Sequence, residues 1–177
     1  MTKRILGLAI VTLLWLSSAT AQTSEAPSRR EVLVAIETLR SRFLSAEALQ
    51  AAEVVMRFVE LSEDCLIVLD PVAIPWAENT ELADVRSPET MLRSLLLAAY
   101  FAGNTKAQLD SGKVEDMPYP GWIFVIRAYK AIQEKTDFNI PSIDELVEME
   151  EKGTLERYAR ILKARRDAGP DEPAEII

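Results

Sequence analysis

The sequence predicts an all-α protein of about six helices, packed as antiparallel hairpins after a cleaved signal peptide. Apolar residues recur at helical spacing along most of the chain. Serine, proline and glycine stand where helices would begin and end, and no set of alternating segments indicates a sheet. Helices joined by short connections pack against their neighbours, so we expect a helical bundle or a short solenoid-like array.

Residues 1–21 have the pattern of a secretory signal peptide. Lys3 and Arg4 precede an apolar stretch at 5–16, and small residues at 19–21 provide a cleavage site. The apolar stretch is shorter than the roughly 20 residues of a membrane-spanning helix. We therefore expect cleavage after Ala21 and an exported protein, periplasmic if the source is bacterial and otherwise secreted.

The remaining 156 residues divide into three parts. We expect a mobile leader at 22–27, a single α-helical domain at 28–166 and a disordered acidic tail at 167–177. Apolar residues make up 49% of the chain, enough for a core in one domain. No stretch after residue 21 is long and apolar enough to span a bilayer, so we expect no stable membrane insertion after cleavage.

Two helices open the predicted domain. The first begins near Ser28, and its apolar stripe comprises Val32, Ile36, Leu39 and Phe43. Ser45 is the expected N-cap of the second, whose apolar stripe comprises Leu49, Ala52, Met56 and Val59. The short link between them predicts a hairpin.

The segment at 65–80 is less regular. Pro71 and Pro75 exclude one continuous helix, so we expect a packed connection with a short helical turn and with Trp76 in the core. A short buried strand at 65–69 is the alternative.

Ser87 and Pro88 predict the start of a third helix, which should end at Gly112 in a left-handed cap. Gly103 lies within this helix beside Ala99 and Ala102. Such a cluster of small residues predicts that another helix approaches closely.

The stretch at 117–132 predicts a central buried helix, because it is apolar around most of its circumference. Pro118 and Pro120 should form an extended lead-in to it. In the alternative interpretation, Tyr119 and Trp122, together with Trp76, form a binding groove, since aromatic side chains are frequent anchors at interfaces.

Two further helices complete the predicted domain. Ser142 and Glu145 have the spacing of a capping box, which places a helix start at Ser142. Gly153 should end that helix, and Thr154 should cap the last one.

The composition excludes several function classes. The net charge is −8, and loss of Lys3 and Arg4 with the signal peptide makes it −10. Such a protein repels nucleic acid and anionic membranes. The chain contains no histidine, which removes Cys/His metal sites and every catalytic arrangement based on histidine. We expect no metal ion and no cofactor.

Cys65 is the single cysteine and lies among apolar residues, so we expect a buried thiol. An intermolecular disulfide is the alternative.

Three functions are compatible with these features. The first is a non-catalytic module of the cell envelope that binds another protein, and the absence of a recognisable catalytic motif favours it. The second is an acidic inhibitor or immunity-type protein that neutralises a basic toxin or enzyme. The third is a small carboxylate-dependent hydrolase, since two carboxylates suffice for glycoside hydrolysis. Its candidate residues are Asp70, Glu78, Glu81 and Asp84, although a solvated acidic loop explains this cluster more simply.

Overall fold

The computed structural model describes residues 25–77 and 87–168. The predicted signal peptide and the predicted tail from residue 169 onward lie outside this part. The described residues form six α-helices and one short 3-10 helix, with no β-strand among them, as the sequence predicts. None of their helices is both long and apolar enough to cross a membrane.

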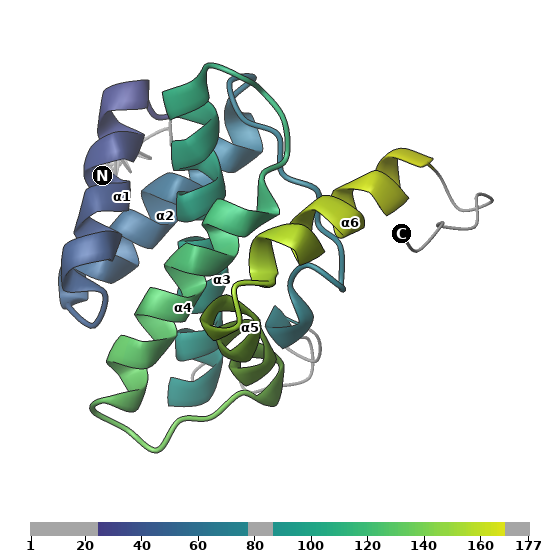
Figure 1. Cartoon of the computed structure of the whole chain (residues 1–177). Coiled ribbons are helices and arrows are strands. Elements are labelled where there is room, and N and C mark those ends of the chain that lie inside the picture. The colour runs from purple at the N-terminus through teal and green to yellow at the C-terminus, as the bar shows by residue number, and fades with distance from the viewer. Residues whose placement is uncertain (1–24, 78–86, 169–177) are drawn as a thin grey trace, which may run out of the picture.

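Figure 1 shows the arrangement of the helices. Their bounds are α1 Arg29–Arg42, α2 Ala46–Leu61, η1 Pro75–Ala77, α3 Pro88–Ser111, α4 Pro118–Gln133, α5 Pro141–Glu151 and α6 Leu155–Ala168. α1 packs along α2, and α3 packs along α4 and also contacts both α1 and α2. α5 and α6 contact each other, and both also contact α4. The last helix, α6, ends at Ala168 (Figure 1). It therefore includes residues 167 and 168, which were expected to belong to the tail.

The predicted boundaries of α3 are confirmed. The Ser87 hydroxyl accepts a hydrogen bond from the Thr90 amide at 3.1 Å, and Pro88 occupies the first helical position. Gly112 ends the helix with φ of 68°, a conformation that glycine adopts without steric cost. Gly153 has the same φ of 68° just after α5, as expected for a helix end.

The extended lead-in predicted for α4 and the predicted start of α5 are wrong. α4 begins at Pro118, so the expected extended lead-in is its first turn. α5 begins at Pro141, not Ser142, and its N-cap position is Ile140. Both prolines fit because the first residues of a helix need no amide donor. The Tyr129 hydroxyl accepts a hydrogen bond from the Ile140 amide at 2.8 Å, so a tertiary contact replaces the expected capping box.

Ser45 and Thr154 stand directly before α2 and α6, where N-caps were predicted, but neither side chain forms the expected capping bond. Ser45 precedes α2 without a side-chain capping bond. The Thr154 hydroxyl donates back to the Met149 carbonyl at 3.2 Å.

The interior is built around α3 and α4. The predicted face of α4 is buried throughout, including Trp122, Tyr129 and Ile132. Gly103 faces the start of α4, where an added Cβ would meet the Pro120 carbonyl oxygen. The close approach predicted from the small residues of α3 is therefore confirmed.

The predicted core face of α2 is displaced by one position. The buried residues are Ala48, Ala51, Val55 and Phe58. The predicted stripe lies beside them, and two of its members, Leu49 and Met56, are 47% and 39% exposed. α2 thus has two adjacent apolar stripes, and the core covers only one of them fully.

Candidate functional site

The two tryptophans proposed for a groove are core residues. Trp76 and Trp122 are 1% and 0% exposed. The Trp122 indole donates a hydrogen bond to the Ala73 carbonyl at 2.7 Å and stacks on the Tyr158 ring with centroids 5.4 Å apart. Trp76 meets the Tyr100 ring edge-on. A partner has no access to either indole in this structure.

Tyr119 lies in the first turn of α4 and is half-buried. Burial raises the pKa of its phenol, and the nearby carboxylates of Glu150 and Glu156 raise it further. Of the three aromatic candidates, only this side chain reaches the surface.

The proposed acidic cluster is only partly described. Glu78, Glu81 and Asp84 lie outside the described residues. Asp70 accepts a hydrogen bond from the Val72 amide at 2.8 Å and lies 3.7 Å from the Arg166 guanidinium. Its carboxylate therefore stabilises the local turn and lies within ion-pair distance of α6.

A polar cluster that we did not predict lies between α3 and α6. Asn104 donates to Asp116 at 2.7 Å, and Arg166 donates to the other carboxylate oxygen of Asp116 at the same distance. The Gln108 side chain exchanges two hydrogen bonds with the Leu66 backbone, at 2.9 and 2.7 Å. These contacts attach the irregular segment and α6 to the central helix. Asn104 and Gln108 are spaced i, i+4 and lie on the buried side of α3, and that spacing was the available sequence signal.

Cys65 is a buried free thiol beside this cluster. Its sulfur lies 3.2 Å from the Thr105 hydroxyl, and burial raises the pKa of the thiol. Burial and the raised pKa lower the reactivity of the thiol, because the thiolate is the nucleophilic form. The prediction of a buried thiol is confirmed.

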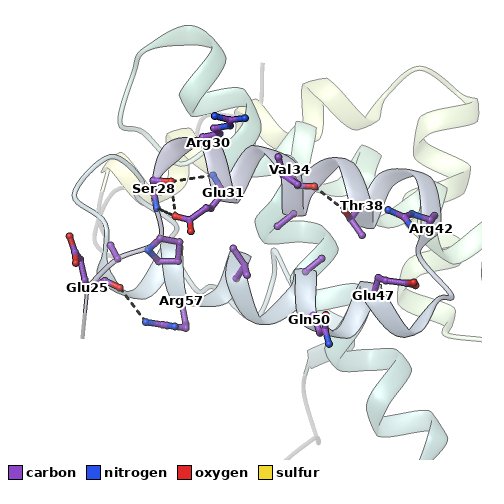
Figure 2. A pocket seen from close by; sticks show the side chains of 15 residues that line it. Glu25, Ser28, Arg30, Glu31, Val34, Thr38, Arg42, Glu47, Gln50 and Arg57 are labelled. Atoms are coloured by element: carbon purple, nitrogen blue, oxygen red, sulfur yellow. Dashed lines mark hydrogen bonds between the residues drawn. The ribbon is translucent and has the colours of Figure 1, made fainter. Parts of the chain in front are cut away.

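A surface groove of about 780 Å³ runs between α1 and α2 (Figure 2). Several of its polar groups already bond within the chain. Ser28 and Glu31 form a capping box, and Arg57 donates to the Glu25 carbonyl at 3.2 Å. Arg42 and Glu47 lie at the opposite end. The groove is therefore polar and mixed in charge.

A second groove of about 390 Å³ lies between α2 and α3, and we call it the α2–α3 groove. Nearly all of its lining is apolar. The lining residues are Leu49, Ala52, Glu53 and Met56 from α2, and Met91, Ser94, Leu95, Leu97 and Ala98 from α3. The open stripe of α2 thus forms one wall of a hydrophobic depression.

The comparisons with known proteins and the metal-ligand geometry assign no chemistry to either groove. No family model, curated protein or solved structure matches the chain. Within residues 25–77 and 87–168, no group of three or more cysteine, aspartate or glutamate side chains could hold a metal ion.

Proposed function

We propose that this chain is an exported, non-catalytic helical protein that binds another protein of the cell envelope through the α2–α3 groove. The supporting observation is the second apolar stripe of α2. Leu49, Met56 and Met91 remain 47%, 39% and 43% exposed where two helices form a depression. Adjoining exposed apolar side chains of this kind mark interaction sites more often than isolated ones do.

The side chains of the groove suit a protein partner. Methionine adapts its shape to an apolar surface at little cost, because its side chain is unbranched and polarisable. Only Glu53 and Ser94 add polar groups to the lining. An arrangement of this composition supplies apolar contact area, which drives most protein association.

Export and the hairpin arrangement are parts of the same proposal. The signal-peptide pattern at 1–21 supports export. The packing of α1 with α2 and of α3 with α4 supports helical hairpins.

The test is affinity capture with tagged protein, residues 22–177, from an envelope extract of its own source. The double variant Met56→Gln, Met91→Gln makes the groove polar while keeping side-chain length and helix propensity. Val34→Gln, a similar apolar-to-polar change at a 61% exposed residue of the α1–α2 groove, is the matched control. We expect the double variant to lose its partner and the control to retain it, with both variants matching the wild type in circular dichroism. Recovery of the same partner by the double variant, or no partner for the wild type, would refute the proposal.

A further inference from the structure

The lining of the α2–α3 groove carries charge of one sign. Glu53 is the only charged residue of its lining, and it has no ion-pair partner among the described residues. Glu60 is exposed and lies four residues after Met56, which places it on the same edge of α2 one turn further. The α2 edge of the groove is therefore acidic.

The nearest arginines on both helices are directed elsewhere. Arg57 donates to the Glu25 carbonyl, on the α1 side of α2. Arg93 pairs with Glu89 at 2.9 Å and donates to the Trp76 carbonyl at 3.1 Å, toward η1. None of the lysine and arginine side chains in the described part of the chain is among the residues that line the groove.

The shape of the groove suits a helix. Its α2 wall has apolar residues at 49, 52 and 56, and its α3 wall has them at 91, 95 and 98. Each row extends over eight residues, a rise of about 10 Å, which is two turns of a helix. A third helix with apolar residues at i, i+3, i+4 and i+7 fills such a depression between two helices.

We infer that the segment of the partner that occupies the α2–α3 groove is a basic amphipathic helix, with lysine or arginine beside its apolar stripe facing Glu53 and Glu60. This inference rests on the proposed function and adds the chemical class of the partner. A second copy of the chain is a poor occupant, because two-fold pairing through the groove would bring two acidic edges together without a cation.

The test uses two synthetic helical peptides of about 18 residues with the same leucine stripe. One carries lysine at its remaining positions and the other carries glutamate. Binding to residues 22–177 is measured by fluorescence anisotropy at about 20 mM and about 300 mM salt. We expect the lysine peptide to bind at least about tenfold more tightly at low salt, and this preference to shrink at high salt.

Two pairs of substitutions separate the groove from the overall charge. Glu53→Gln with Glu60→Gln should remove most of the preference for the lysine peptide. Glu145→Gln with Glu156→Gln removes the same charge from exposed positions on α5 and α6. This pair should leave most of the preference for the lysine peptide. Met56→Gln with Met91→Gln should weaken both peptides, and gel filtration should show a monomer.

The outcomes distinguish this inference from the proposed function. Equal binding of both peptides, or binding that Met56→Gln with Met91→Gln does not change, overturns the inference. So does the failure of both peptides to bind, and so does self-association that the same double variant abolishes. If envelope capture still depends on Met56 and Met91 in any of these cases, the proposed function stands without a basic helix.

Discussion

The substitution Gly103→Ala tests the central packing of the fold. In the wild type, α3 and α4 approach closely because Gly103 has no side chain. A Cβ built there meets the Pro120 carbonyl oxygen, the Phe124 Cβ at 2.8 Å and the Gly121 Cα at 3.0 Å. Two of these atoms belong to the backbone of α4, and the third is fixed directly to it, so no side-chain rotation relieves the overlap.

The expected loss of stability follows from two opposing terms. Alanine is favoured over glycine inside a helix by about 1 kcal/mol. Overpacking of a rigid core costs about 1–3 kcal/mol, and contacts with backbone atoms place this site at the upper end. The net expectation is a loss of about 2 kcal/mol. With a urea m-value of about 2 kcal/mol/M for a domain of this size, the midpoint should fall by about 1 M.

The assay is urea unfolding followed by far-UV circular dichroism. Gly112→Ala is the control, because a Cβ there meets no atom within 4 Å and only the φ of 68° is unfavourable. It should cost about 1 kcal/mol, less than Gly103→Ala. If Gly103→Ala is as stable as the wild type, α3 and α4 do not approach as closely as described.

Three further predictions concern the polar cluster and the buried titratable groups. Asp116→Asn leaves the Arg166 guanidinium without the carboxylate 2.7 Å away, and the free energy of unfolding measured in urea should fall by about 3 kcal/mol. Glu115→Gln is the control, because it removes a half-exposed ion pair and should have a much smaller effect. Cys65 should react with a thiol reagent far more slowly in the native protein than in denaturant, because it is buried and its pKa is raised; equal rates would contradict this. Burial also raises the pKa of Tyr100 above its ordinary 10.0, and that of Cys65 above 9.0, so the unfolded chain loses these protons first. The free energy of unfolding should therefore be constant between about pH 7 and about pH 8.5 and fall above about pH 9. A flat profile from about pH 7 to about pH 11 would be inconsistent with the burial of both groups.

Local patterns were sufficient to predict most helix boundaries. The Ser87–Pro88 start and the Gly112 end of α3 depend on groups within a few residues, and both are found as predicted. The buried face of α4 was equally predictable, because nearly its whole circumference is apolar. The start of α5 was not, because the amide of its N-cap residue, Ile140, donates to Tyr129 of α4, a contact between two helices.

The candidate site was predicted less well than the fold. The sequence favoured aromatic residues, yet the structure buries Trp76 and Trp122. Large aromatic side chains occur both in cores and at interfaces, so residue type alone does not distinguish the two positions.

The sequence by itself determined the helical class, the net charge and the absence of histidine, since these depend only on composition and on local spacing. Only the tertiary structure decided which stripe of α2 is buried. The stripes beginning at Ala48 and Leu49 are both apolar and differ by one residue, a rotation of about 100° around the helix. The packing against neighbouring helices selects one of them, and the stripe that is left open forms a wall of the α2–α3 groove.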